Sequence, residues 1–180
     1  MPELRATPTD SQLISAWRKG DEVAATELVR RHAGAVARYL SAAGGGDDVE
    51  DLVQEAFYRA FRKLDGFRGT ASFRTWVMTI GSNVLKDMRR RETRRPVFAL
   101  EDREVVDERS NPHATTVVRD MESRLQSAIQ QLPPKQREVF LMRAQQGIDY
   151  DEIASALGTS VGAARVHYHQ AVKRLKKAME

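Results

Sequence analysis

The feature that most constrains the fold is a pair of apolar patterns at helical spacing, in residues 49–64 and 73–88. Residues three and four apart lie on one face of an α-helix, so each pattern marks one buried stripe. The first stripe consists of Val49, Val53, Ala56, Phe57, Ala60 and Leu64. The second consists of Phe73, Trp76, Val77, Ile80, Val84 and Met88. The patterns predict amphipathic helices packed against one another, and therefore an all-α protein.

Polar residues occupy the other side of the first helix. Asp51, Gln54 and Glu55 recur at i, i+3 and i+4 and form a solvated face. No histidine, serine or lysine accompanies the carboxylates in a catalytic arrangement, so we interpret the face as a docking surface rather than an acid–base pair.

A short loop and a basic helix end follow this first helix. The loop places Phe67 and Arg68 between two glycines, and six cations then occur in the ten residues 86–95. Clustered cations meet phosphate, and exposed aromatic rings can stack on unpaired bases. Helical spacing alone leaves other interpretations of these residues open. Phe73, Trp76 and Ile80 fit a core stripe, and the basic run could be a solvated helix end stabilised by the macrodipole.

Residues 11–95 resemble region 2 of the bacterial sigma-70 family, and more narrowly the extracytoplasmic-function (ECF) group. The resemblance rests on DLVQEAFYRAFRKLDGFRGTASFRTWVMTIGSNVLKD. It implies that Asp51, Gln54 and Glu55 dock on the β′ clamp helices of RNA polymerase. It further implies that the loop and the next helix capture the melted −10 element. The residues expected there are Phe67, Arg68, Phe73, Arg74, Asn83, Lys86, Arg89 and Arg90. Without this resemblance, Asn83 would be interpreted as a solvated or helix-bonded side chain.

A second signature lies in residues 149–178. Asp149 and Glu152 have capping-box spacing, Gly158 allows a tight turn, and Ser160 can cap a longer helix. This pattern is typical of a helix-turn-helix, whose second helix enters the DNA major groove. Many regulators share it. Together with LPPKQREVFLMRAQQGIDYDEIA it resembles sigma region 4, which reads the −35 element.

The outward face of the second helix follows from its 100° rotation per residue. Together with the cap Ser160, the candidate −35 contacts are Arg165, Val166, His169, Gln170 and Lys173. Fewer arginines face outward than in many members of the family. The −35 sequence therefore cannot be carried over from relatives.

The domain organisation expected from these patterns is two small helical domains, in residues 1–95 and 117–180. Residues 96–116 lose helical periodicity and include an acidic run, so we expect an extended, flexible linker that resembles region 3.2 in position. Within the first domain, Asp21 should cap a helix with Val23 on its inner side. The glycines at 44–46 should end it, and Asp47 and Glu50 should form a capping box for the next helix.

Composition bounds the remaining chemistry. The chain has 180 residues, a formal charge of +4 and no cysteine, which excludes disulfides and Cys-ligated zinc. His167 and His169 point apart on a helix, so neither a metal site nor a cofactor is expected. No apolar run is long enough to insert into a membrane, and the first residues lack the apolar core of a signal peptide. A cytoplasmic location is expected.

The function expected from the resemblance is that of a sigma factor, not an enzyme. Such a protein binds core RNA polymerase through its β′ clamp helices and β flap, recognises promoter DNA at −10 and −35, and promotes melting. An anti-sigma factor is expected as a further partner. An autonomous helix-turn-helix regulator would explain residues 122–180 but not the aromatic loop. A DNA-processing enzyme would need a nucleophile with supporting arginines or an acidic metal cluster, and neither assembles convincingly in the sequence.

Overall fold

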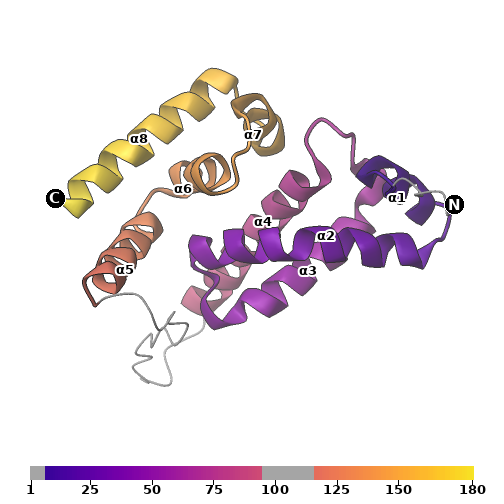
Figure 1. The fold of residues 1–180 in the computed structure, drawn as a ribbon, viewed down its shortest axis with the longest axis horizontal. Helices are drawn as coiled ribbons and strands as arrows, with labels where there is room; N and C mark the ends of the chain where they lie inside the picture. The colour runs from indigo at the N-terminus through magenta and orange to yellow at the C-terminus, as the bar shows by residue number, and fades with distance from the viewer. Residues whose placement is uncertain (1–6, 95–115) are drawn as a thin grey trace, which may run out of the picture.

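The computed structural model describes residues 7–94 and 116–180. In these ranges the chain forms eight α-helices with short 3-10 and π turns and no β-strand, which confirms the all-α prediction. Figure 1 shows two groups of helices, which we call the N-terminal bundle (α1–α4) and the C-terminal bundle (α5–α8). The predicted linker lies outside the described residues except for Thr116, so its conformation and the domain limits stay predictions.

The N-terminal bundle consists of α1 (Asp10–Trp17), α2 (Glu22–Leu40), α3 (Val49–Arg62) and α4 (Phe73–Arg94). The Asp21 side chain accepts a hydrogen bond from the Val23 backbone, which confirms the predicted cap of α2. The inward position predicted for Val23 is wrong, because its side chain is 76% exposed. Ala24 lies one turn before the fully buried Leu28 and takes the inner position instead.

Two polar contacts hold the helices of this bundle together. The hydroxyls of Tyr39 on α2 and Ser82 on α4 are 2.7 Å apart and buried. Burial raises the pKa of Tyr39 well above its ordinary value, so the group is a neutral hydrogen-bonding partner. The His32 ring on α2 lies 2.6 Å from the Asp10 carboxylate and ties α1 to α2.

The glycine break after α2 occurs where it was predicted. The chain passes through a π turn, η1 (Ser41–Gly45), and a 3-10 turn, η2 (Gly46–Asp48), with Gly44 at a φ of 96° that favours glycine. The predicted capping box of Asp47 and Glu50 is wrong, since α3 begins at Val49 with no side-chain cap bond. The 3-10 turn runs directly into α3, so the extended residue that a capping box needs is missing.

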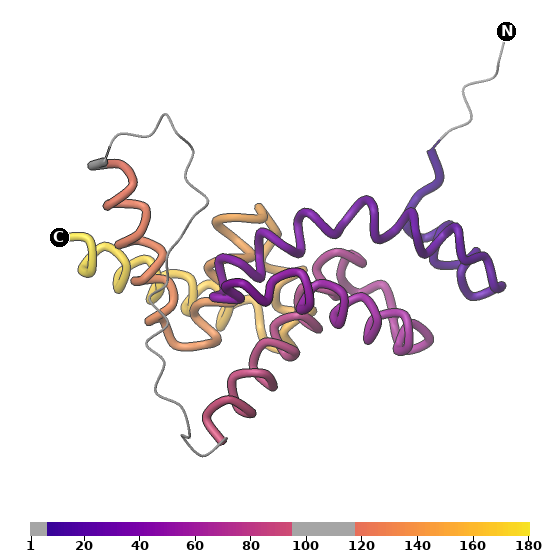
Figure 2. The backbone as a smooth tube through the Cα atoms, turned by 90° about the horizontal axis from the view of Figure 1, so that it is seen from below, coloured from indigo at the N-terminus to yellow at the C-terminus, as the bar shows by residue number. Residues whose placement is uncertain are grey.

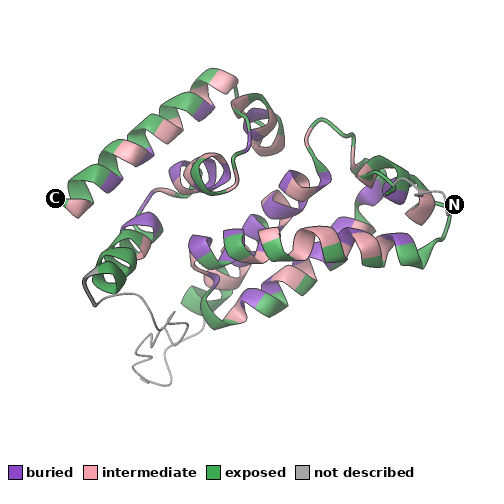
Figure 3. Cartoon of the chain, viewed as in Figure 1, coloured by how far each residue is buried: buried purple, intermediate pink, exposed green. Residues whose placement is uncertain are grey.

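The C-terminal bundle consists of α5 (Thr116–Gln130), α6 (Pro134–Phe140), α7 (Tyr150–Leu157) and α8 (Val161–Met179). A π turn, η4 (Leu141–Gln145), extends α6. Val139, Met142, Ile153 and Ala164 are fully buried at its centre. Figure 3 shows exposed residues along the outer face of α8 and over much of the N-terminal half of α5.

The two bundles lie against each other. The start of α4 faces α7, and α5 lies beside η1, so the buried apolar residues of both bundles form one cluster. Figure 2 shows the last turns of α4 extending away from α2 and α3. No helix in the two described ranges is long and apolar enough to cross a membrane.

Candidate nucleic-acid interface

The loop between α3 and α4 is held from outside by α1. The Arg18 guanidinium, next to the end of α1, donates to the carbonyl oxygens of Leu64 at 2.9 Å and Phe67 at 3.3 Å. A charged donor on two loop carbonyls fixes the backbone that carries the Phe67 ring. Sequence reasoning missed Arg18, because its partners lie more than forty residues away along the chain.

An aromatic cluster supports the loop from beneath. The half-buried Phe67 ring lies 4.9 Å from Trp76 and meets Phe73 edge-on at 6.1 Å. Phe73 itself is only 2% exposed and packs against Phe57 and Phe61. Its expected contact with a base is therefore not supported, because the ring is part of the core. Phe67 is the aromatic side chain that the loop presents.

The predicted −10 residues of α4 divide into two groups. Asn83 and Arg90 are exposed, and so is Arg68 in the loop, while Arg74 is half-buried. The ammonium group of Lys86 instead forms an ion pair with Glu138 of α6. One nitrogen of Arg89 donates to the carbonyls of Ala43 at 3.0 Å and Gly44 at 2.9 Å.

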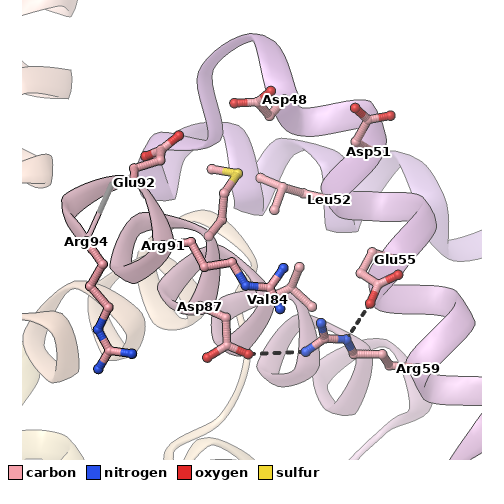
Figure 4. A pocket seen from close by; sticks show the side chains of 11 residues that line it. Asp48, Asp51, Leu52, Glu55, Arg59, Val84, Asp87, Arg91, Glu92 and Arg94 are labelled. Atoms are coloured by element: carbon pink, nitrogen blue, oxygen red, sulfur yellow. Dashed lines mark hydrogen bonds and ion pairs between the residues drawn. The ribbon is translucent and has the colours of Figure 1, made fainter. Parts of the chain in front are cut away.

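The polar face of α3 borders a groove against the end of α4. The groove has a volume of about 880 Å³ and is lined by Asp51 and Glu55 of α3 and by Asp87 and Arg91 of α4, among others (Figure 4). Arg59 bridges it with bonds to Glu55 at 2.6 Å and Asp87 at 3.3 Å. Hydrogen bonding to Glu55 is the main reason that the pKa of Arg59 is raised. Asp51 remains exposed at the rim, as does Gln54 elsewhere on α3.

The helix-turn-helix forms as predicted around Gly158 and Ser160. Gly158 ends α7 in the left-handed region with a φ of 60°, and the Ser160 hydroxyl accepts from the Ala163 backbone at 3.1 Å to cap α8. The predicted capping box at the start of α7 is wrong. Asp149 accepts instead from Arg143 at 3.3 Å, and Glu152 turns away from its own helix.

The outward side chains of α8 share one exposed face. They are Arg165, Val166, His169, Gln170 and Lys173. Two of them are also held in place by neighbours. The Arg165 guanidinium lies 5.6 Å from the centre of the Tyr150 ring, and Gln170 accepts from Gln136 at 2.9 Å. Across the described ranges, no group of three or more acidic, histidine or cysteine residues could hold a metal ion.

Glu152 makes a contact between the two bundles that sequence reasoning did not predict. Its carboxylate accepts from the Ser72 backbone at 3.0 Å and from the Thr75 hydroxyl at 2.6 Å, at the start of α4. Burial alone would raise the pKa of Glu152, but the hydrogen bonds from Ser72 and Thr75 together lower it by more. The pKa of Glu152 therefore lies below its ordinary value. A residue predicted to cap its own helix therefore joins the two bundles.

Comparisons with known proteins match both bundles. The family model of Sigma-70 region 2 matches residues 28–95, and that of Sigma-70, region 4 matches residues 122–175. The ECF RNA polymerase sigma-E factor of Escherichia coli (strain K12) is 34% identical over 166 residues, which cover 87% of each chain. The RNA polymerase sigma factor NccH of Alcaligenes xylosoxydans xylosoxydans is 30% identical over 176 residues, or 95% of each chain.

Solved structures share the fold. CnrH in complex with the cytosolic domain of CnrY matches with a TM-score of 0.70 and 28% identity, over 93% of this chain and 95% of that chain. The sigma factor RpoE from Bartonella quintana, solved with the anti-sigma factor NepR, matches with a TM-score of 0.66 and 21% identity. That match covers 86% of this chain and 95% of RpoE.

Proposed function

The chain belongs to the ECF group of sigma-70 family RNA polymerase sigma factors, and from that premise we propose how its surfaces divide the work of initiation. A sigma factor is a transcription initiation factor and not an enzyme. The N-terminal bundle binds core polymerase and the −10 element, and the C-terminal bundle reads the −35 duplex. The match to region 2 over residues 28–95 argues against an autonomous helix-turn-helix regulator, which would not need that region.

The exposed face of α8 is the observation that carries this proposal. A helix held at its start by Ser160 presents Arg165, His169 and Gln170, which can donate hydrogen bonds to base edges or phosphates. Val166 is 54% exposed between them and suits the methyl group of a thymine. Such a face is suited to reading duplex DNA in the major groove.

The loop and α4 act on separated strands. Unstacking a base costs a few kcal/mol, and stacking it on an aromatic ring returns about 1–3 kcal/mol. Phe67 offers that ring, and the exposed Asn83 offers hydrogen bonds to the edge of an unpaired base. Binding only the melted form shifts the equilibrium towards opening.

The exposed residues of α3 dock on the β′ clamp helices. To test this, we would change Asp51 to Lys together with Gln54 to Ala, and leave Glu55 in place because it holds Arg59. Affinity for core polymerase should fall by about tenfold or more, with unchanged circular dichroism. Glu22→Lys, an equal charge change on the exposed start of α2, is the matched control. An equal loss in the control would sink the assignment.

The function as a whole is tested by transcription from a pooled promoter library with purified core enzyme. Transcripts should require both the chain and the core, and their start sites should define the −10 and −35 motifs. Specific footprints on promoters by the free chain, without core, would instead support the autonomous regulator.

An anti-sigma factor is the further partner that we propose. CnrH, which shares the fold and 28% of the sequence, was solved with the cytosolic domain of CnrY. The exposed apolar side chains of Val118, Met121 and Leu125 on one side of α5 give such a partner a surface to bury. Because a sigma factor acts on RNA polymerase, we also propose a cytoplasmic location. On the core enzyme, the β flap is the expected contact of the C-terminal bundle.

A further inference from the structure

Gln136 is a polar residue on the inner face of α6. It lies one turn before the fully buried Val139 and is itself only 8% exposed. Its amide nitrogen donates to the side-chain oxygen of Gln170 on α8 at 2.9 Å. Gln170 belongs to the exposed outward face of α8. The bond therefore runs from the interior of the C-terminal bundle to the surface proposed to read duplex DNA.

The helix that carries Gln136 does not need its amide. Gln136 is the third residue of α6, a position from which a glutamine often reaches back to the backbone N–H of the capping residue. In α6 the capping residue is Pro133, which has no N–H to donate, and the helix has no side-chain cap bond. The amide of Gln136 is therefore available to another element.

The amide of Gln136 is also unfavourable to bury. Within the part of the chain that the structure describes, its own oxygen is buried without a hydrogen-bond partner. A buried acceptor without a donor lowers the free energy of unfolding, and an apolar side chain of similar length avoids that loss. Stability alone does not explain a glutamine at this position, whereas the bond to Gln170 does.

The bond determines which end of the Gln170 amide faces outward. Because the oxygen of Gln170 accepts from Gln136, its NH₂ group is the end left for a ligand. The rings of Phe140 on α6 and Tyr168 on α8 stack with their centres 6.0 Å apart, and this contact holds the two helices together. The amide is therefore oriented before DNA binds, and less side-chain freedom is lost on binding.

An outward NH₂ group at this point of α8 suits a phosphate. In a helix-turn-helix the first residues of the second helix reach base edges, but Gln170 is the tenth residue of α8 and lies one turn beyond Val166. It is placed for the phosphates that border the groove, to which glutamine side chains can donate. An amide oxygen turned towards a phosphate would place two acceptors together, and the bond from Gln136 prevents that orientation.

We propose that Gln136 is a positioning residue for promoter binding. It holds the Gln170 amide with its NH₂ group outward, and this group donates to a phosphate of the −35 duplex. The inference rests on the proposed function for the role of α8. Gln170 thus adds a phosphate contact without adding a charge, and Gln136 acts through it without touching DNA.

The salt dependence of holoenzyme binding to duplex promoter DNA tests the Gln170 contact. Gln170→Ala should weaken binding about three- to tenfold at every salt concentration, because one hydrogen bond is lost. The slope of affinity against salt should stay the same, since a neutral amide releases no counterion. Arg165→Ala, which removes a charge from the same face, should reduce the slope by about one ion if it contacts phosphate. Unchanged affinity or a reduced slope for Gln170→Ala would overturn the proposal.

Gln136→Met separates positioning from a purely structural role. Methionine is similar in length and has no amide, so the melting temperature should stay the same or rise. Promoter binding should nevertheless weaken about two- to fivefold, because the Gln170 amide is no longer held in place. Gln131→Met, the same change at an exposed residue just before α6, is the matched control. A Gln136→Met variant that lost stability but bound promoter DNA normally would show that Gln136 is only structural.

A double-mutant cycle shows whether Gln136 acts through Gln170. Adding Gln136→Met to Gln170→Ala should cause no further loss of promoter binding, because the side chain to be positioned is already gone. If Gln136→Met weakened binding by the same factor in both backgrounds, the two residues would act independently and the positioning role would be refuted.

Promoter selection from a pooled library distinguishes a phosphate contact from base reading. Gln136→Met should leave the preferred −35 sequence unchanged, because phosphate contacts carry no sequence information. A changed preference at one −35 position would overturn the phosphate contact. Holoenzyme with the unchanged chain that selected no promoter would refute the proposed function itself. Normal selection with no binding defect in either glutamine variant would overturn this inference alone.

Discussion

The two helices proposed to touch DNA, α8 and α4, differ in how their functional side chains are used. Arg165, His169 and Lys173 of α8 are exposed in a face that is complete as it stands. On α4, Lys86 forms an ion pair with Glu138 of the C-terminal bundle, and Arg89 donates to backbone carbonyls at the end of α2. The difference teaches that the surface proposed to read duplex DNA is preformed, whereas two of the side chains proposed to capture the melted strand are held by contacts within the protein.

The same difference recurs within α4 itself. Arg89 and Arg90 are adjacent in the basic cluster and would be treated alike from the sequence. Arg89 donates to Ala43 and Gly44 at the end of α2, while Arg90 is exposed. One residue therefore holds the fold and its neighbour is available to DNA.

The largest expected effect separates these two arginines. Arg89→Ala leaves the carbonyl of Gly44 without its charged donor and should lower the free energy of unfolding by about 2 kcal/mol. Thermal denaturation of the full chain measures this. Arg90→Ala should leave the melting temperature unchanged and weaken binding of holoenzyme to promoter DNA, with a salt dependence smaller by about one ion. Equal melting temperatures for the two variants would erase the distinction.

The next effect tests what the exposed amide of α4 does. Asn83→Ala should reduce initiation on an ordinary promoter by roughly tenfold, the loss of one good base contact. The defect should largely vanish on a template whose −10 region is already mismatched if Asn83 promotes opening. If Asn83 reads a base, the defect should persist on that template and depend on the base present. A variant with normal activity on both templates would remove Asn83 from the −10 surface.

A smaller effect is expected from the preformed face. Arg165→Ala should weaken holoenzyme binding by a few-fold on ordinary and mismatched templates alike, since the −35 duplex is the same in both. Electrophoretic mobility shifts at several salt concentrations would measure it, with a slope reduced by about one ion for a phosphate contact. Arg174→Ala, also exposed on α8 but outside the outward set, serves as the control. A template-dependent loss would contradict the division between the two helices.

The smallest effect is a pH dependence of the contact between the bundles. The pKa of Glu152 is below its ordinary value where its carboxylate meets the start of α4, so the bonds to Ser72 and Thr75 stabilise this contact most at pH values above the ordinary carboxyl range. Their contribution should be lost as the pH falls through the lowered pKa. The distance between spin labels on Lys63→Cys and Lys176→Cys, exposed residues of the two bundles, should therefore lengthen on acidification, and a labelled Glu152→Ala variant should show less change over the same range. Equal lengthening in both would assign the effect to other groups.

Much of the fold could be predicted because helical periodicity is a local property. The stripe of α3, the cap of α2 at Asp21 and the turn at Gly158 each depend on residues within one or two turns. Val23 was misplaced because an apolar residue in a first turn satisfies the pattern without reaching the core. The exposed face of α8 could be predicted for the same reason, since it needs only the rotation per residue.

The contacts between distant elements could not be predicted in this way. Both predicted capping boxes failed, and Glu152 shows why: a carboxylate three residues after a cap can bond its own helix or any other helix start within reach. The resemblance and the clustered charge predict that Lys86 and Arg89 contact DNA, and nothing local in the sequence reveals Glu138 or the end of α2 as their partners. The roles of the exposed residues in DNA and polymerase binding stay predictions.

The bond from Arg18 to the loop that carries Phe67 has a consequence for protein engineering. A chimaera that grafts α2–α4 into another sigma factor would inherit the loop but not its brace, which is supplied by the residue next to α1. We expect such a chimaera to recognise the donor's −10 element less selectively, although every residue proposed to contact that element had been transferred. The smallest segment that we expect to carry −10 specificity into another sigma factor therefore includes α1 and Arg18.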